Sequence, residues 1–193
     1  MPWEKSFDES EVVERAMKVF WQKGYAATSI SDITNATGIQ RGSLYNAFDG
    51  KHDLFVRGLL KYGDDRRAVK LQMLAAVDDP REAITMFFES LVKSSLADPD
   101  KKGCLLFNTA LEYSTHQDDV QQHVSAGIQD VVEFFKGRIN QGKELGVISD
   151  SVDTVSTANA LIALVVGLRV LGRGAFGKTA LQQVAKQALA LIS

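Results

Sequence analysis

Small and polar residues follow one another at Gln40-Arg41-Gly42-Ser43. An arginine can hydrogen-bond guanine edges or phosphates, and glutamine and serine side chains can hydrogen-bond bases. Gly42 carries no side chain, so the backbone there can approach a partner closely. At the start of a helix, these groups occupy the end that would enter a DNA major groove. The four residues are therefore candidates for reading a DNA sequence.

Other chemistry-bearing groups give weaker signals. Glu112, His116, Asp119 and His123 recur at spacings of three or four residues, as metal ligands on one helix face would. However, residues 114–118 are typical of a helix break, and histidines seven residues apart on a helix lie about 10 Å apart, too far for one ion. We expect no metal, no cofactor and no enzymatic activity.

The single cysteine, Cys104, follows Lys101, Lys102 and Gly103 at the expected start of a helix. Nearby cations and free backbone amides favour the thiolate, so the sulfur could react. The alternative is a buried, unreactive cysteine that packs as a small apolar residue. A lone cysteine cannot form an intrachain disulfide, which fits a reducing compartment.

The charge distribution restricts where nucleic acid can bind. The chain of 193 residues has a formal net charge of −2, which argues against a protein that coats DNA with its whole surface. Between Arg15 and Lys61, however, Lys and Arg exceed Asp and Glu by four. This excess permits a local phosphate-binding face in the first third of the chain.

Helices must position these groups, because apolar residues recur at spacings of three and four and no alternating strand pattern of useful length occurs. We predict an all-α fold of about nine helices. The first ends at Gly24, the second covers residues 30–37 between Ser29 and Gly38, and the third covers residues 41–47. The second and third helices form a helix-turn-helix.

A fourth helix is predicted to begin near residue 51 and to extend as far as residue 74. Pro80 follows a polar turn and occupies the first position of a fifth helix. The remaining helices are predicted over residues 104–113, 118–144 and 153–171, with a last one from about residue 178. The fourth helix is the natural place to divide the chain.

The helix-turn-helix and its flanks contain the following residues: Gly24-Tyr25-Ala26-Ala27-Thr28-Ser29-Ile30-Ser31-Asp32-Ile33, Gly38-Ile39, Gly42-Ser43-Leu44-Tyr45-Asn46-Ala47-Phe48, Lys51 and Leu54-Phe55. With these residues, the segment 7–62 resembles the DNA-binding domain of the tetracycline-repressor (TetR/AcrR) family of bacterial transcriptional regulators. The resemblance implies a helix-turn-helix DNA-binding domain over residues 1–55 and a ligand-binding and dimerisation domain over residues 56–193. It implies a homodimeric regulator, by default a repressor, that binds a palindromic operator and alters its DNA binding with a small-molecule effector.

The same resemblance implies contacts to the DNA backbone from four side chains, which position the protein without specifying sequence. In the alternative interpretation, Thr28 and Ser29 are only helix caps. Tyr45 is then partly core, and Lys51 is a solvated charge. At two positions the chain departs from the family: Ala47 replaces a frequent histidine, and Gln40 replaces a common small hydroxyl residue. The operator sequence is therefore not predicted. The four residues are Thr28, Tyr45, Asn46 and Lys51.

Aromatic and aliphatic side chains on the fifth to seventh helices supply enough bulk to line an apolar effector cavity with few polar groups. An ordinary hydrophobic core is the alternative. The residues expected to line the cavity are Phe87, Phe88, Leu91, Cys104, Phe107, Asn108, Leu111 and Phe134.

Residues 153–171 are apolar on most faces, which in a soluble protein indicates burial on more than one side. Together with the last helix they are expected to form a four-helix bundle between two subunits, as the resemblance also implies. An intrachain core is the alternative. The residues expected at the dimer interface are Ala160, Leu161, Leu164, Val165, Gly167, Leu168, Leu171, Leu181, Val184 and Ala188.

No uninterrupted apolar run reaches the roughly 18–20 residues of a membrane span, and residues 1–10 show no secretory signal. We therefore expect a cytoplasmic protein whose partners are double-stranded DNA, a second copy of itself and an effector, with no membrane. Two other functions stay open. The Gly103-Cys104 pair looks like a feature of family members that sense electrophiles or oxidants through a thiol, and a helical protein-interaction module would not bind DNA at all.

Overall fold

The computed structural model describes residues 7–193, and all regular structure in that range is helical. A π-helical segment, Gly63–Ala68, joins α4 (Gly50–Tyr62) to α5 (Val69–Ala75) without a break, so these three form one continuous rod. When the rod is counted as one helix, the described residues contain nine α-helices. The all-α prediction is confirmed. The start of the predicted first domain and most of the segment tested for a secretory signal, residues 1–6, lie outside the described range. The helices are α1 (Glu9–Lys23), α2 (Ile30–Thr37), α3 (Arg41–Ala47), α4 (Gly50–Tyr62), α5 (Val69–Ala75), α6 (Pro80–Leu96), α7 (Leu105–Leu111), α8 (Asp118–Glu144), α9 (Thr154–Leu171) and α10 (Lys178–Ala190).

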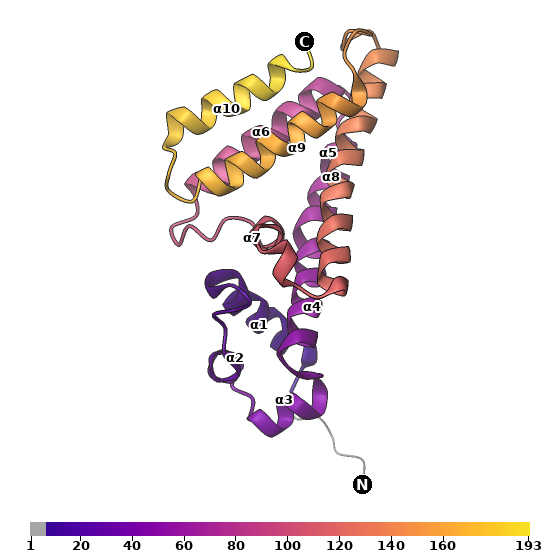
Figure 1. Ribbon diagram of the computed structural model, residues 1–193. Helices are drawn as coiled ribbons and strands as arrows, with labels where there is room; N and C mark the ends of the chain where they lie inside the picture. Colours follow the sequence, from indigo (N-terminus) through magenta and orange to yellow (C-terminus); the bar gives the residue numbers. More distant parts are fainter. Residues whose placement is uncertain (1–6) are drawn as a thin grey trace.

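The first three helices and the start of α4 form a small head at one end of the molecule (Figure 1). Phe20 of α1 is buried and meets Phe55 of α4 edge-on, with ring centroids 5.1 Å apart. Ser29 and Asp32 form a capping box at the start of α2, and Gly38 ends that helix in the left-handed conformation at φ 77°. These local signals set the bounds of α2 and thereby the direction in which α3 leaves it.

The rod of α4, the π-helical segment and α5 leaves the head and runs beside α8 (Figure 1). Arg67 of the π-helical segment lies between the rod and α8, with Nη2 3.1 Å from Asp130 Oδ2. A Cβ atom at Gly127 would lie 2.5 Å from the Arg67 guanidinium and 3.0 Å from Leu106. The glycine therefore makes room for a side chain that links the rod to the second domain.

Polar and aromatic contacts join the head to the start of α8. His52 Nε2 of α4 lies 2.8 Å from Asp119 Oδ2, and the ring of Phe55 stacks on that of His116 at 5.5 Å. His116 is buried, and this burial lowers its pKa. These contacts connect the head directly to the start of α8.

α9 packs along α6, α8 and α10, and it is the one helix of the described residues that is long and apolar enough to cross a membrane by length and composition alone. Only 22% of it is buried inside the chain. Its inward face is formed by Ala158, Leu161, Val165 and Leu168. The other face is largely apolar and is left incompletely covered in the single chain.

Candidate DNA interface and effector cavity

The start of α3 presents free polar groups on the surface of the head. Gln40 is the N-cap residue of α3, but its side chain makes no capping hydrogen bond. Gln40, Arg41 and Gly42 are exposed and Ser43 is half-buried, whereas Leu44 is fully buried and anchors the helix to the head. The four residues predicted to read DNA therefore lie together at the exposed end of a short, anchored helix.

Tyr45 and Asn46 extend this surface by one turn. Tyr45 is 49% exposed, and the Arg41 guanidinium carbon lies 5.8 Å from the centre of its ring. Asn46 is also exposed. The side chains predicted for base reading and those predicted for phosphate contact thus form one continuous patch on α3.

Thr28 and Lys51 are placed differently, because both side chains are used inside the protein. Thr28 is 2% exposed, and its hydroxyl donates to the Gly24 carbonyl at 2.6 Å. Lys51 Nζ donates to the Tyr25 carbonyl at 3.0 Å and the Thr28 carbonyl at 2.9 Å, and lies 4.4 Å from the Tyr25 ring centre. Ser29 caps α2, as the alternative interpretation holds, but Thr28 does not. Lys51 bridges elements of the head instead of only facing solvent.

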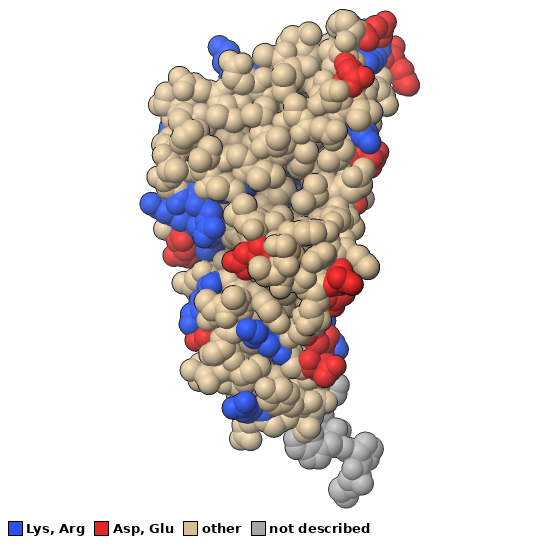
Figure 2. Space-filling model, in the orientation of Figure 1, with Lys and Arg blue, Asp and Glu red and all other residues tan. Residues whose placement is uncertain are grey.

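The excess positive charge of the head is largely paired with carboxylates. Lys23 contacts Asp32 at 2.5 Å, and Arg57 contacts Asp53 at 2.8 Å. Of the seven cations between residues 15 and 61, only Arg41 and Lys51 form no ion pair within the described residues. Figure 2 shows Lys and Arg side chains over the head end of the molecule. Arg41 is therefore the exposed cation most available to a phosphate or a base.

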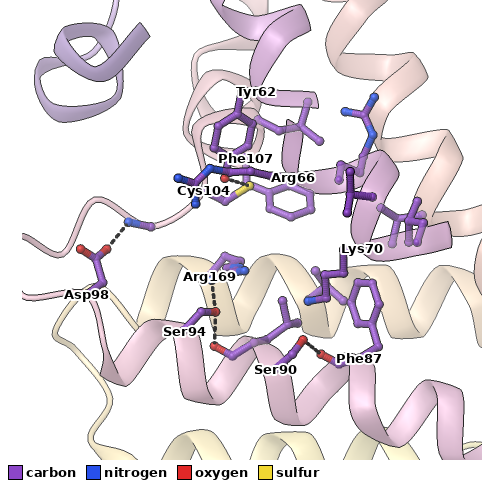
Figure 3. Close-up of a pocket in the computed structure, with 18 of the residues that line it drawn as sticks. Tyr62, Arg66, Lys70, Phe87, Ser90, Ser94, Asp98, Cys104, Phe107 and Arg169 are labelled. Atoms are coloured by element: carbon purple, nitrogen blue, oxygen red, sulfur yellow. Dashed lines mark hydrogen bonds between the residues drawn. The ribbon is translucent and has the colours of Figure 1, made fainter. Parts of the chain in front are cut away.

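A cavity of about 850 Å³ lies between the rod, α6, α7, α8 and α9 (Figure 3). Four of the residues predicted to line it do so: Phe87, Leu91, Cys104 and Phe107. Ring and aliphatic carbons of these and neighbouring residues form most of the wall. The cavity is therefore of a size and shape that suits a small organic molecule.

The other four predicted lining residues do not border this cavity, which corrects the sequence interpretation. Phe88 is buried and stacks on Phe135 at 5.9 Å, and Phe134 lies behind Phe87 at 5.7 Å. Asn108 donates to the Lys102 carbonyl at 2.7 Å. Leu111 is 60% exposed at the end of α7. Helical spacing identified the apolar residues, but it did not say which of them face the cavity and which face the core.

The cavity also contains residues that sequence analysis missed. Trp21 of α1 lines it, so the head itself forms part of the wall. Arg66 and Lys70 face it from the rod, and Arg169 faces it from α9. The only available signal was the polar stretch in the middle of the fourth helix, which is ordinary for a solvated surface. Lys70 and Arg169 are half-buried because α6, α7 and α9 close over the rod, whereas Arg66 stays exposed.

Cys104 lies on the wall of this cavity at the N-cap position of α7. It is 8% exposed, and the Tyr62 hydroxyl donates to its Sγ at 3.4 Å. Burial, together with the adjacent cysteine, raises the pKa of Tyr62 far above its ordinary value, so the phenol stays a neutral donor. A small molecule in the cavity would therefore meet the sulfur directly.

Half of the residues predicted for the dimer interface lie in the core of the single chain: Leu161, Val165, Leu168, Leu181 and Ala188. Their inward side chains pack α9 and α10 onto the rest of the domain, as the intrachain alternative holds for them. The other five predicted residues are half-buried, and they are Ala160, Leu164, Gly167, Leu171 and Val184.

The uncovered stripe of α9 extends beyond the ten residues predicted for the dimer interface. Val155 and Ala163 are exposed, and Ile162 and Val166 are half-buried. Asn159, also exposed, is the polar member of this stripe, one helical turn from both Val155 and Ala163. The surface that α9 leaves open is therefore mainly apolar, with one amide in its middle.

Two family models match the chain. The model for bacterial regulatory proteins of the tetR family matches residues 12–57, and that for the tetracyclin repressor-like C-terminal domain matches residues 80–189. The HTH-type transcriptional repressor ComR of Escherichia coli (strain K12) is 27% identical over 189 residues, which cover 97% of this chain and 90% of that protein. The uncharacterized HTH-type transcriptional regulator YezE of Bacillus subtilis (strain 168) is 29% identical over 153 residues, covering 79% and 78%.

Solved structures agree with these matches. The TetR family transcriptional regulator CifR, in a cysteine-mutant form complexed with 26-bp double-strand operator DNA, superposes with a TM-score of 0.84 at 26% identity. The alignment covers 97% of this chain and 98% of that one. The reduced form of E. coli NemR, at 17% identity and a TM-score of 0.82, shares the fold. The second family model alone matches more than half of the residues of this chain. The chain therefore belongs to the TetR family of bacterial transcriptional regulators.

Proposed function

We propose that the protein represses transcription as a homodimer that binds a palindromic operator, and that a small molecule in the 850 Å³ cavity changes its DNA affinity. The observation that carries the DNA part is the largely exposed polar patch at the start of α3, where the side chains of Gln40, Arg41 and Ser43 make no hydrogen bond or ion pair with the described residues. Relatives named as repressors and a neighbour solved with operator DNA support it. A cytoplasmic site of action follows from this role.

The individual roles follow from exposure and chemistry. Gln40, Arg41, Gly42 and Ser43 read base edges, because they combine free donors and acceptors with close backbone approach. Tyr45 and Asn46 contact the backbone of the DNA. Thr28 and Lys51 act at the rim of the same surface, where their internal hydrogen bonds hold the start of α2 in place. The division between domains at residues 55 and 56 falls within α4.

The uncovered stripe of α9 supports a homodimer. Val155 is 55% exposed, and Ala163 is an exposed small residue that allows a second helix to approach closely. Asn159 lies between them, and a single polar residue in an apolar seam can fix the register of two packed helices. In Figure 2 the surface over α9 and α10 is almost free of charged side chains. Covering such a surface with its two-fold mate removes apolar area from water and fixes the distance between two heads.

The cavity lies where a bound ligand can change the distance between the two heads of the dimer. Its wall includes Trp21 of the head, the rod that continues α4, and Arg169 of the helix that carries the dimer stripe. A ligand that prefers one arrangement of these three elements shifts the population of head orientations. Its affinity difference between the two arrangements sets the size of the DNA response.

Selection of bound fragments from sheared genomic DNA by the purified chain tests this function. We expect enrichment of a two-fold symmetric site that competitor DNA of random sequence displaces only weakly. Affinity for that site should fall steeply with salt, because phosphate contacts release counterions. Recovery of no preferred sequence, with binding equal to random duplex, contradicts the proposal and favours a helical protein-interaction module.

A second candidate function, a thiol switch, is favoured by the position of Cys104 on the cavity wall beside Tyr62. N-ethylmaleimide should form a bond between Sγ and one alkene carbon, with the thiol proton ending on the other carbon. The added ring occupies the cavity, and we expect operator affinity to fall roughly tenfold, a change of about 1.4 kcal/mol. The reaction is specific for one site because the chain has one cysteine.

Fluorescence anisotropy on labelled operator measures this effect, and mass spectrometry reports the extent of modification. Cys104→Ser, treated in the same way, is the matched control and should keep its operator affinity. Complete modification of the native chain without a change in operator affinity rules the switch out. Loss of affinity in the treated serine variant would show that the reagent acts elsewhere.

A further inference from the structure

The side chains that line the cavity carry a strong excess of one charge. Five are cationic, and among the described lining residues Asp98 is the single acid. Its carboxylate accepts a hydrogen bond from the Gly103 amide at 2.9 Å and is thereby used in the connection between α6 and α7. The five cations are Arg66, Arg67, Lys70, Lys102 and Arg169.

Two of the five cations are neutralised by carboxylates that do not line the cavity. Arg67 pairs with Asp130 at 3.1 Å, and Lys102 pairs with Asp100 at 2.6 Å. The other three form no ion pair within residues 7–193: Arg66, Lys70 and Arg169. Figure 3 shows these three side chains around the same space, next to Phe87 and Phe107. Three cations without an ion pair therefore border a largely apolar cavity: Lys70 and Arg169 are half-buried, and Arg66 stands at its solvent-exposed side.

Lys70 is the clearest case. Its ammonium lies 4.4 Å from the centre of the Phe87 ring and makes no hydrogen bond to the described residues. Burial, with the nearby Arg169 guanidinium, lowers the pKa of Lys70 to about 8. Leaving a cation desolvated and close to a second cation costs free energy, and an anion beside it would remove that cost.

Two buried atoms of cavity-lining residues lack hydrogen-bond partners, and both are hydrogen-bond donors, as the lysine ammonium is. Trp21 Nε1 and Arg67 Nε are buried without a hydrogen-bond partner, and both residues line the wall. Both atoms are donors, and an acceptor atom on a bound molecule within reach would satisfy them. Arg169 Nη1 already donates to Ser94 Oγ at 2.9 Å, which holds its guanidinium in position at the wall.

We infer that the cavity binds an apolar organic acid as its anion, with the acid group among Arg66, Lys70 and Arg169 and the apolar body against Phe87, Leu91 and Phe107. The inference deepens the proposed function, because it gives the chemical class of the effector. The cations and donors attract the acid group, while the aromatic and aliphatic wall favours a body without further charges. A neutral molecule of the same shape can accept hydrogen bonds from the donors, but it leaves the positive charge uncompensated.

Isothermal titration calorimetry of the full chain with matched pairs tests the inference. The probes are naphthalene-2-carboxylate against naphthalene-2-carboxamide, and decanoate against decanamide, each compared at the same pH and salt. We expect at least one acid to bind roughly tenfold or more tighter than its amide, since one charge-assisted contact is worth about 1.5–3 kcal/mol. Amides that bind as tightly as the acids, or acids that fail to bind at about 1 mM, overturn the inference.

Lys70→Met removes the charge and keeps a similar stem, and Lys93→Met on the exposed side of α6 is its matched control. The first variant should lose the preference for the acid, and the second should retain it. Lys70→Met should also raise the melting temperature of the ligand-free chain, because it removes an uncompensated cation. A lower melting temperature with unchanged acid preference would assign Lys70 a structural role and contradict the inference.

Operator affinity measured with the same probes separates this inference from the proposed function. Selective binding of the acids without any change in operator affinity would refute the effector role of the cavity and leave the ligand class standing. Conversely, release of operator by a neutral amide that binds as well as its acid would support ligand control of DNA binding and refute the preference for an anion.

Discussion

Replacement of Arg41 by alanine is expected to lower operator affinity by roughly 30-fold to more than 10,000-fold. A good bidentate contact between arginine and a guanine edge contributes about 1–3 kcal/mol of discrimination. A homodimer places one Arg41 in each half-site, so the loss is about 2–6 kcal/mol for the complex. Arg41 is exposed and forms no ion pair within the described residues, so its removal should leave the melting temperature of the chain unchanged.

Fluorescence anisotropy on the selected operator, and on a scrambled duplex of equal length, measures this loss. Lys93→Ala is the matched control, because it removes the same charge from a site outside the head. If Arg41 reads a base, affinity for the operator falls much more than affinity for the scrambled duplex. An equal loss on both duplexes, with a shallower salt dependence, would assign Arg41 to a phosphate. Unchanged affinity for both would contradict the DNA interface placed at α3.

The bounds of several helices could be predicted because they are set by residues that lie nearby in the sequence. The predicted ranges 30–37, 41–47 and 118–144 coincide with α2, α3 and α8. The Ser29 cap and Gly38 act within a few residues of the helix they begin or end. The π-helical segment after α4 was not predicted, because it accompanies the contact of Arg67 with α8, more than sixty residues away in the sequence.

The cavity shows the limit of reasoning from pattern. Phe87, Leu91 and Phe107 could be predicted as apolar residues on inward helix faces, and they line it. Lys70 and Arg169 could not, because a lysine or arginine within an amphipathic helix is normally solvated and nothing local marks it as covered.

For α9 the sequence contains many apolar positions, and the difficulty is to tell which of them are buried within the chain. Apolar residues occupy most faces of this helix, so the sequence does not show which of them the chain itself covers. Only the packed structure separates the buried Leu161 and Val165 from the incompletely covered Ile162 and Val166.

Ala163→Glu is expected to convert the dimer into a monomer that still folds. Ala163 is exposed in the single chain, so a glutamate there points into solvent and costs little helix stability. In the dimer it would lie within the apolar stripe, where two unpaired carboxylates would be buried close to each other. Sedimentation velocity should show the mass of one chain, and the melting profile should report a folded protein.

DNA binding separates this effect from a general defect. A monomer loses the gain from two linked half-sites, so affinity for the full operator should fall about 100-fold to 10,000-fold. Affinity for a duplex with a single half-site should stay the same, because the exposed patch on α3 is untouched. Ala126→Glu places the same charge at an exposed alanine of α8 and should remain dimeric with full affinity. A dimeric Ala163→Glu variant would show that α9 is not the seam, since Ala163 lies in the middle of its uncovered apolar stripe.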